Sequence, residues 1–439
     1  MLNDPMPELT LRHTGCHPRM WRRDRHRPPW ATLPTLIAAS LLLAACGEGR
    51  PSGDADTIVR DSAGIEIVES GAPAWGSEAS WRISPEPVLE IGATTGPEAY
   101  LLDRVVGAVR LSDGRIVIGD GGSRQLRYYD TDGRHIVDAG GQGGGPGEFG
   151  ILSRIVRMPG DSVGGWESNA KRLSIFDADG NFGRSVTFDV AGQFFAPLHG
   201  VFADGSVVIS PGQDMLALRT LEPGEYRRTK VYLRFAGDGT FLDTLTTAPG
   251  PEAVFYREGT SSGNRDVFFG RDHHIAFAGE HFYEGDSGAF VLTASAPDGA
   301  PLRLIRRAFE PRAVTPDELE SEVRRTTESR ARSLSSLAEQ TGRDLSGFSQ
   351  PDDVTHRETY PAFDGLLVDT EGNLWVEAYP VPGTETREWS VFDPDGRWLG
   401  EIRTPEGVEI YQIGSDYLLG RWLDDFEVHY VRVYRLTKP

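Results

Sequence analysis

The chain comprises 439 residues, of which 38% are hydrophobic and 10% are aromatic, and nine of them are Trp. This apolar content is sufficient for a large packed core, so it excludes a wholly disordered chain, and the length suits one large domain or two ordinary ones. The formal net charge of −20 argues against nucleic acid as a partner, because binding to phosphates depends on a concentrated basic surface.

Residues 1–45 predict a signal peptide of the lipoprotein type. A basic run, Arg19 to Arg27, precedes an apolar segment at 33–43 that is too short to span a bilayer. The following Leu43-Ala44-Ala45-Cys46 resembles the bacterial lipobox, in which the cysteine is lipidated and becomes the mature N-terminus. We therefore expect lipidation at Cys46 and a membrane partner through that lipid. An ordinary signal peptide with a stray cysteine is the alternative.

Residues 46–56 are polar and contain Gly and Pro, so they are expected to form a flexible tether to a domain at 57–439. The expected location is the cell envelope, lipid-anchored and extracytoplasmic. Gly47 supplies no aspartate retention signal, which by resemblance to Gram-negative lipoprotein sorting favours the periplasmic face of the outer membrane. The only other cysteine, Cys16, would leave with the signal peptide, so no disulfide is expected in the domain.

A repeated hairpin pattern organises the rest of the chain. Residues 125–149, QLRYYDTDGRHIVDAGGQGGGPGEF, have two strand-like runs around an Asp-Gly turn, followed by a glycine-rich exit. The pattern recurs at 172–188, 231–245, 290–305 and 388–402. Two further strand-like runs precede each hairpin, so we expect four-stranded units near 105–140, 153–188, 199–245, 274–308 and 365–403, and a last unit at 408–436 with three strands.

A strand at 87–92 has no preceding partner, while the last unit lacks a fourth strand. An N-terminal strand that completes the C-terminal sheet is the usual closure of a β-propeller, and closure removes open sheet edges. We therefore predict an all-β fold, a six-bladed β-propeller in which residues near Leu89 pair with the final strand near Tyr434. A pair of β-sandwiches or an open solenoid would not explain the strand at the opposite terminus. A small hairpin at 57–68 has no predicted partner.

Residues 312–350 predict a helical insertion between blades four and five. Thr315-Pro316-Asp317-Glu318 has the form of a capping box with Pro at the first helical position. Leu319, Val323 and Leu334 follow at near-helical spacing, and the pattern continues to about Thr341. We expect this helix to lie across one end of the propeller with a narrow apolar stripe toward it.

Two segments carry a resemblance to a known group. The exit GGGPGEF at 143–149 and the strand GLLVDTEGNLWV at 365–376 resemble bacterial six-bladed propeller lipoproteins related to NHL-repeat proteins. The resemblance covers about residues 87–437 and implies the fold far more than an activity. Members of the wider group include binding modules, an amidating lyase and gluconolactonase-like hydrolases.

Three local motifs are better explained by structure than by chemistry. The glycine run 140–147 is not followed by the Lys of a phosphate loop, so it is expected to be a crossover with positive φ. The turns that begin at Asp130, Asp177 and Asp393 lack the twelfth-position carboxylate of a calcium loop. The G-x-S-x-G motif at 259–263 precedes no helix and is expected to lie in a loop before a short strand at 267–269.

The predicted inner strands begin near Arg104, Arg154, His199, His274 and Asp364, so these side chains are expected to approach one end of the axial channel. Histidines and a carboxylate there could hold a divalent metal, as the lyase and lactonase relatives do. No metal-ligand spacing such as H-x-H occurs, however, and adjacent residues on a strand, such as His273 and His274, point to opposite faces. No cofactor is therefore predicted, and His199, His274 and Asp364 remain the candidates for a metal.

The leading hypothesis is a lipid-anchored binding module for a protein, peptide or small-molecule ligand, with Arg104 and Arg154 as candidate ligand contacts at the channel mouth. The alternative is a metal-dependent lyase or lactone hydrolase with its site at the same mouth. The sequence leaves open whether the protein is an enzyme.

Overall fold

The computed structural model describes residues 57–76, 80–191, 195–212, 221–258, 261–341, 354–384 and 386–438. The predicted signal peptide at 1–45, its Cys46 and the tether at 46–56 lie outside the described residues. The chain divides into two compact units, Met1–Glu48 and Gly49–Pro439, and the second holds every element described below.

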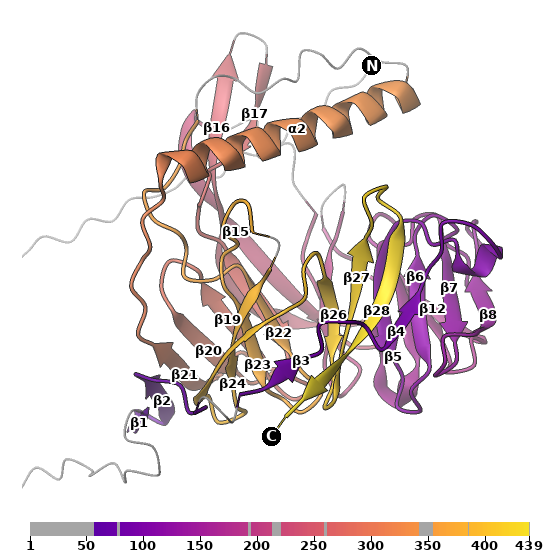
Figure 1. Cartoon of the computed structure of the whole chain (residues 1–439), viewed down its shortest axis with the longest axis horizontal. Coiled ribbons are helices and arrows are strands. Elements are labelled where there is room, and N and C mark those ends of the chain that lie inside the picture. Colours follow the sequence, from indigo (N-terminus) through magenta and orange to yellow (C-terminus); the bar gives the residue numbers. More distant parts are fainter. Residues whose placement is uncertain are drawn as a thin grey trace, which may run out of the picture. The chain divides into compact units, whose positions relative to one another are not determined.

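Short antiparallel strands form six sheets among the described residues, and the sheets follow one another along the chain (Figure 1). Sheet 1 contains β5 (Val105–Arg110), β6 (Ile116–Asp120), β7 (Gln125–Tyr129) and β8 (His135–Gly140); sheet 2 contains β9 (Arg154–Arg157), β10 (Val163–Glu167), β11 (Arg172–Phe176) and β12 (Phe182–Thr187); and sheet 3 contains β13 (Leu198–Val201), β14 (Val207–Ile209), β15 (Gly224–Phe235), β16 (Phe241–Glu258) and β17 (Ser261–Asp266).

The second half repeats this plan. Sheet 4 contains β18 (His273–Phe277), β19 (Phe282–Asp286), β20 (Val291–Ser295) and β21 (Pro301–Arg307); sheet 5 contains β22 (Gly365–Val368), β23 (Leu374–Glu377), β24 (Glu388–Phe392) and β25 (Trp398–Arg403); and sheet 6 contains β26 (Glu409–Ile413), β27 (Tyr417–Leu423) and β28 (His429–Thr437). The remaining elements are β1 (Thr57–Ser62), β2 (Ile65–Ser70), β3 (Arg82–Ile83), β4 (Leu89–Ile91), the 3₁₀ turns Glu98–Tyr100 and Pro159–Asp161, and the helix α2 (Pro316–Thr341).

Aspartate-glycine turns join the third and fourth strands of several sheets, as the hairpin pattern predicted. In sheet 1 a carboxylate oxygen of Asp130 accepts hydrogen bonds from the backbone N–H of Asp132 at 2.9 Å and of Arg134 at 2.8 Å. Gly133 completes the turn with a φ of 77°, which is accessible to glycine at little cost. The carboxylate thus bonds to the turn's own backbone, which is the hairpin interpretation of this motif.

The first strands of sheets 1 to 5 contact one another in order, from β5 to β9, β13, β18 and β22, and β26 contacts β5. Sheets 5 and 6 are linked by the N–H of Thr370, which donates to the carbonyl oxygen of Ile413 at 3.0 Å. Sheets 6 and 1 are linked by the N–H of Arg110, which donates to Oε1 of Gln412 at 2.6 Å. The six sheets therefore follow one another around a closed ring.

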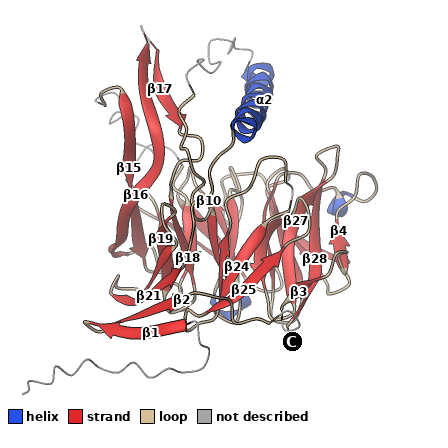
Figure 2. Ribbon diagram, turned by 60° about the vertical axis from the view of Figure 1, so that its left-hand side comes forward, coloured by secondary structure: helices blue, strands red, loops and turns tan. Residues whose placement is uncertain are grey.

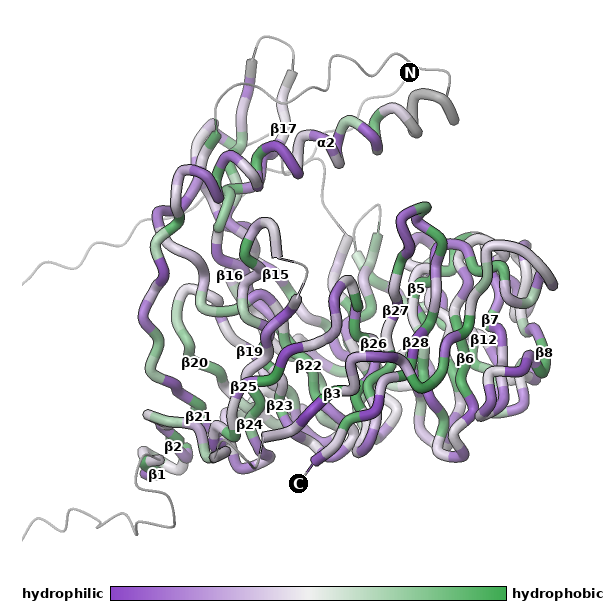
Figure 3. Tube along the Cα trace, viewed as in Figure 1, coloured by the Kyte–Doolittle hydropathy of each residue, from purple (hydrophilic) through white to green (hydrophobic). Residues whose placement is uncertain are grey.

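The hydrophobic core is divided among the interfaces between neighbouring sheets. A separate cluster of buried side chains fills each of the six interfaces of the ring. Trp166 lies in the cluster between sheets 2 and 3, and Trp375 and Trp389 lie between sheets 5 and 6, each at most 4% exposed. Figure 3 shows hydrophobic and hydrophilic positions alternating along many of the strands. Many small antiparallel sheets packed in this way are consistent with a β-propeller.

The N-terminal strand pairs with the C-terminal one, as the sequence predicted. β4 lies antiparallel to β28, with Leu89 opposite Val433 and Ile91 opposite Val431. Ile91 is only 1% exposed and packs with residues of sheets 6 and 1. The two ends of this unit are thus joined within one sheet.

The segment at 57–91, here called the N-terminal strap, covers more of the ring than the sequence indicated. Its hairpin, β1 and β2, extends sheet 4 because β2 pairs in parallel with β21. The N–H of Trp75 then donates to the carbonyl oxygen of Leu399 in β25 at 2.7 Å, before β3 and β4 pair with β28. The strap therefore contacts the fourth strand of sheet 4, the fourth strand of sheet 5 and the last strand of sheet 6.

α2 begins with the predicted capping box. The N–H of Glu318 donates to the Thr315 hydroxyl at 3.3 Å, and the N–H of Thr315 donates to the Glu318 carboxylate at 3.0 Å. α2 lies between β21 and β22 in sequence, at the end of the molecule from which β15, β16 and β17 project (Figures 1 and 2). Within the described part of the chain, no helix has the length and apolarity needed to cross a membrane.

Two details of the third unit differ from the prediction. β15 begins at Gly224, so the hairpin of this unit begins before residue 231, where the repeat placed its start. Ser261–Asp266 forms β17, paired with β16, whereas a loop was expected there and a strand at 267–269. Pairing with the extended β16 imposes a strand on this polar sequence, because the neighbouring backbone supplies its hydrogen bonds.

Candidate functional site

The first strands of the sheets begin at one end of the ring, here called the axial mouth, and the predicted site residues lie at or beside those beginnings. Arg104 and Asp364 directly precede β5 and β22, Arg154 begins β9, and His199 and His274 are second in β13 and β18. The sequence repeat thus predicted that each of these residues lies at or beside the beginning of the first strand of its sheet.

Arg154 occupies an unusual environment. Its side chain is exposed to solvent, yet the protein that surrounds it lowers the pKa of the guanidinium through burial. Among the described residues it forms no hydrogen bond and no ion pair. An arginine that is reached by water, enclosed by protein and unpaired is available to bind an anionic group.

His199 lies next to Arg154 in the ring. Its Nε2 is 2.8 Å from the Ser210 hydroxyl, and its ring meets the ring of Tyr232 edge to face at 4.8 Å. Burial, with the charges of Arg154 and Lys230, lowers the pKa of His199 to about 3. His199 is therefore neutral at physiological pH and can donate or accept a hydrogen bond according to its tautomer.

His273 and His274 point to opposite faces of sheet 4, as predicted. The ring of His273 is 3.2 Å from the Tyr232 hydroxyl and 3.2 Å from the Glu284 carboxylate, toward sheet 3. The ring of His274 instead lies 5.5 Å from that of Phe363, beside sheet 5. Burial lowers the pKa of His274 to about 4, so this ring is also neutral at pH 7.

Asp364 is the acidic member of the mouth. Burial raises the pKa of its carboxyl, which the charge of Arg387 opposes and those of Asp272 and Glu322 increase. Within the described residues, the Asp364 carboxylate accepts no hydrogen bond and forms no ion pair. Its neighbour Glu377 differs in this respect, because Arg387 pairs with it at 2.9 Å.

Arg104 does not join these groups. It has a left-handed φ of 48°, and its guanidinium donates a hydrogen bond at 2.8 Å to the carbonyl oxygen of Gly121 in its own sheet. Its side chain is 64% exposed and lies 3.7 Å from Asp103. The guanidinium of Arg104 is thus bonded within its own sheet, which the position of the strand alone could not predict.

The metal candidates do not form a cluster. In the described part of the chain, no group of three or more His, Cys, Asp or Glu side chains is arranged to hold a metal ion. His199, His274 and Asp364 belong to three successive sheets, and His199 is bonded to Ser210. The three residues are therefore separate polar groups along one side of the mouth.

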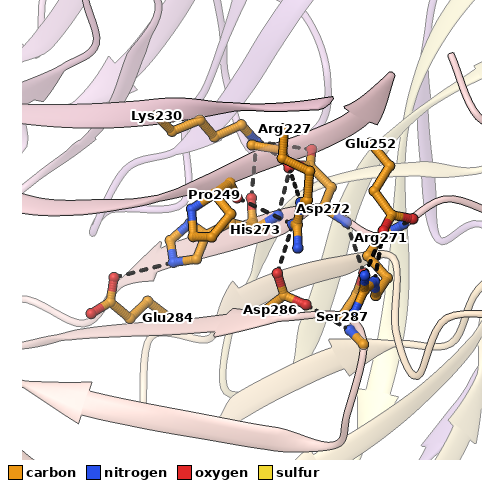
Figure 4. Close-up of polar contacts among 12 residues, drawn as sticks. Arg227, Lys230, Pro249, Glu252, Arg271, Asp272, His273, Glu284, Asp286 and Ser287 are labelled. Carbon is orange, nitrogen blue, oxygen red and sulfur yellow. Dashed lines mark hydrogen bonds and ion pairs between the residues drawn. The ribbon is translucent and has the colours of Figure 1, made fainter. Parts of the chain in front are cut away.

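A polar network between sheets 3 and 4 was not predicted (Figure 4). Lys230 lies 2.8 Å from Asp272, and Arg227 lies 2.6 Å from Asp286. Both pairs join the long hairpin of sheet 3 to the first strands of sheet 4. The sequence gives little signal for them, because each partner is a common surface residue more than forty positions from the other.

Glu252 of β16 is the buried centre of a second part of this network. Its side chain is 4% exposed and pairs with Arg271 at 2.6 Å and with Arg357 at 2.9 Å. Burial alone would raise its pKa, but hydrogen bonds from the two arginines more than offset this and lower it to about 2. Arg357 follows α2 in sequence, so Glu252 ties the segment after the helix to sheets 3 and 4.

A pocket of about 580 Å³ opens at the base of the long hairpin. His199, Ser210 and Lys230 line its polar side, and Phe195 and Tyr226 are among its aromatic residues. His199 lines this pocket and is close enough to Arg154 for that charge to lower its pKa, so the pocket lies beside the axial mouth. The site thus combines polar groups near the axis with a partly apolar side pocket.

No protein-family model matches this sequence, and no curated protein matches it. Similar solved structures include a protein described as exported from Bacteroides fragilis NCTC 9343, with 12% identity and a TM-score of 0.46 over 85% of this chain and 99% of that chain. A DUF4221 family member from Bacteroides vulgatus has 10% identity and a TM-score of 0.47 over 83% and 100% of the two chains. A gluconolactonase from Xanthomonas campestris has 16% identity and a TM-score of 0.35 over 81% of this chain and 100% of that chain. Similarities of this size support no statement about function.

Proposed function

We propose that this protein is a lipid-anchored, extracytoplasmic six-bladed β-propeller that binds a ligand at its axial mouth. Six sheets, six interfacial clusters and the pairing of β4 with β28 support six blades. The lipobox-like sequence 43–46 and the polar tether 46–56 support anchoring in the cell envelope, on the periplasmic face of the outer membrane in a Gram-negative cell. The strand at 365–376 supports a relationship to NHL-repeat propellers.

Arg154 is the observation that carries the binding proposal. The protein has 65 Asp and Glu against 45 Lys and Arg, so carboxylates are plentiful as partners for its arginines. Arg154 has none among the described residues, although the surrounding protein disfavours its charge. Arg154 is exposed to solvent and is not paired with any described residue, so its guanidinium is available to pair with an anionic group of a ligand. The ligand would therefore carry an anionic group.

Thermal-shift screening tests this proposal. The full chain, purified in detergent, would be tested against small organic acids, phosphates and short peptides. We expect some of these compounds to raise the melting temperature of the native protein and to have little effect on Arg154→Gln, since a bound ligand stabilises only the state that holds it. Arg104→Gln is the matched control at the same end of the ring. Equal stabilisation of Arg154→Gln by every active compound would place the site elsewhere.

The second function to be tested is a metal-dependent lyase or lactone hydrolase that uses His199, His274 and Asp364. Elemental analysis of the purified protein separates it from a binding module. A stoichiometric divalent metal that is lost in His199→Ala would favour the enzyme. A metal-free, well-folded protein whose melting temperature is unchanged by chelator would count against it.

The anchoring part of the proposal has its own test. Cells that express the native chain should incorporate labelled palmitate into the protein, and Cys46→Ser should abolish the label. The variant should also move from the membrane fraction to the extracytoplasmic soluble fraction. Retention of the label in Cys46→Ser would exclude lipidation at this position.

A further inference from the structure

Arg154 and Asp364 lie on opposite sides of the axial mouth. Contacts between first strands place the sheets in the order of the sequence around a closed ring. Arg154 begins sheet 2 and Asp364 directly precedes sheet 5, so they are three places apart among six sheets. His199 and His274, both neutral, occupy sheets 3 and 4 between them along one side.

These two charged groups share a second property, which is the lack of a partner. Neither side chain forms a hydrogen bond or ion pair with another described residue. The charged groups that influence Asp364 are themselves paired, Arg387 with Glu377, Asp272 with Lys230 and Glu322 with Arg325. Among the described residues, Arg154 and Asp364 are therefore an unpaired cation and an unpaired anion on opposite sides of the mouth.

The separation of the two groups limits the ligand's length. Arg154 is close enough to His199 of the next sheet to influence its pKa, but it does not contribute to the pKa shift of Asp364, which Arg387, Asp272 and Glu322 influence. The two charges of a single α-amino acid are separated by one carbon atom and cannot reach both residues. A chain of two to four residues spans roughly 7–14 Å when extended.

We propose that the axial mouth binds a short peptide with free termini, its carboxylate on Arg154 and its ammonium group on Asp364. This inference rests on the proposed binding function and names its ligand class. The ring of His274 has no hydrogen-bond partner among the described residues and lies between the two charges, where it can bond to a peptide group of the ligand. Each charge pair would remove one enclosed, unpaired group, so both termini should contribute to affinity.

The test compares tripeptide libraries that differ only at their termini, using the full chain in detergent and mass spectrometry of the retained peptides, followed by calorimetry of the best binder. Blocking the carboxylate as an amide, or the amine as an acetyl group, should each weaken binding by about tenfold or more. Arg154→Gln should remove the sensitivity to amidation and keep the sensitivity to acetylation. Asp364→Asn should do the reverse.

Arg104→Gln and Asp103→Asn are the controls, because these residues form an exposed pair at the same end of sheet 1 and should leave both sensitivities intact. Melting temperatures would show that every variant folds. If no free-termini peptide is retained, or if blocked peptides bind as well as free ones, the inference is wrong. The binding function would still stand if other anions bind through Arg154. If Arg154→Gln does not alter the binding of any compound, both the proposed binding function and this inference are wrong.

Discussion

Glu252 and Asp364 show how the surroundings of a carboxylate determine whether its ionised form stabilises or destabilises the fold. Glu252 is enclosed and paired with two arginines, which lower its pKa to about 2. Asp364 is enclosed and unpaired, and burial raises its pKa. The first carboxylate stabilises the fold in its charged form, and the second destabilises it.

We predict that Glu252→Gln lowers the free energy of unfolding at pH 7 by about 3 kcal/mol, because the change leaves Arg271 and Arg357 without their buried counter-charge. Glu252 has a lower pKa in the folded than in the unfolded chain, so its contribution is complete above about pH 4.5 and is lost as the pH falls toward 2. Urea denaturation of native protein and variant at several pH values measures this difference.

The control is Glu388→Gln, whose partner Arg403 lies 2.6 Å away but whose own side chain is 46% exposed. An exposed pair contributes little, so this change should cost less than about 1 kcal/mol. Equal losses for the two variants at pH 7 would contradict the argument from burial.

We predict the opposite sign for Asp364→Asn. A carboxyl whose pKa is raised in the folded state stabilises the protein below its unfolded pKa, and this contribution is lost as the pH rises through the folded value. At pH 7 the ionised group is unfavourable, so the amide should raise the melting temperature, and the gain should shrink at pH 4. Calorimetry at both pH values checks this. A lower melting temperature at pH 7 would show that Asp364 has a stabilising partner.

For individual residues, the sequence predicted the position along a strand better than it predicted the contacts of the side chain. The repeat placed Arg154, His199, His274 and Asp364 at the beginnings of inner strands, because the strand period and the turn spacing are local properties. It could not predict that the guanidinium of Arg104 bonds within its own sheet. It also could not predict the pairing of Glu252 with Arg357, since these residues are 105 positions apart and meet only through the ring.

The N-terminal strap is the element whose role the sequence least revealed. Trp75 lies against Gly400, where an added Cβ would collide with the indole ring. Trp75 in turn packs against Trp81, with the ring centres 5.2 Å apart and the ring planes tilted by 39°. Trp81 lies 5.9 Å from Trp375, which is fully buried. The glycine thus leaves room for the strap to pack on sheet 5, a long-range relation that no local pattern encodes.

We predict that Trp75→Ala lowers the free energy of unfolding by about 2 kcal/mol, as expected for removal of a half-buried aromatic ring. Gly400→Ala should have a similar cost because the methyl group displaces the same ring. Chemical denaturation measures both. Phe426→Ala, at a side chain that is 86% exposed, should change stability by less than about 0.5 kcal/mol. If the double variant of Trp75 and Gly400 loses the sum of the single costs, the two residues do not act through one contact.

α2 differs from the strap because the chain segments before and after the helix are hydrogen-bonded to each other. The N–H of Val314 donates to the carbonyl oxygen of Glu358, and the N–H of Tyr360 donates to that of Arg312, each at 2.9 Å. None of the helix residues whose exposure is described is fully buried. An ion pair of 3.8 Å between Arg332 and Glu427 links the helix to the turn between β27 and β28. We therefore expect the helix to contribute little to the stability of the ring.

We therefore predict that replacing residues 316–350 by a short Gly-Ser linker leaves a folded protein whose melting temperature falls by only a few degrees. The sequence analysis predicts that α2 lies across one end of the ring, and on that prediction ligand association should become faster. Circular dichroism and stopped-flow binding measure the two effects. Loss of cooperative unfolding in this variant would make α2 a structural element.

At the scale of the whole molecule, the sequence revealed the closure because a missing strand at one terminus and a spare strand at the other are both visible in the repeat. β4 supplies three residues to sheet 6, and the N–H of Val88 also donates to the carbonyl oxygen of Val433 at 2.7 Å. Ile91 extends this pairing into the cluster between sheets 6 and 1. In the strap before β4, β1 and β2 extend sheet 4, which already has four strands, whereas β3 pairs with only the last two residues of β28.

These facts predict different outcomes for two deletions from the full chain. Removing residues 57–86 should leave a monomer that unfolds cooperatively at a lower temperature. The ring keeps β4 but loses β1, β2, the packing of Trp75 and Trp81 on sheet 5 and the two-residue pairing of β3 with β28. Removing residues 57–91 should expose the edge of β28 and empty the place of Ile91, so the protein should aggregate or unfold without a sharp transition. Size-exclusion chromatography and calorimetry distinguish the two variants. The same size and melting temperature in both would mean that the ring is held by contacts between sheets alone and that the pairing of its two ends adds nothing.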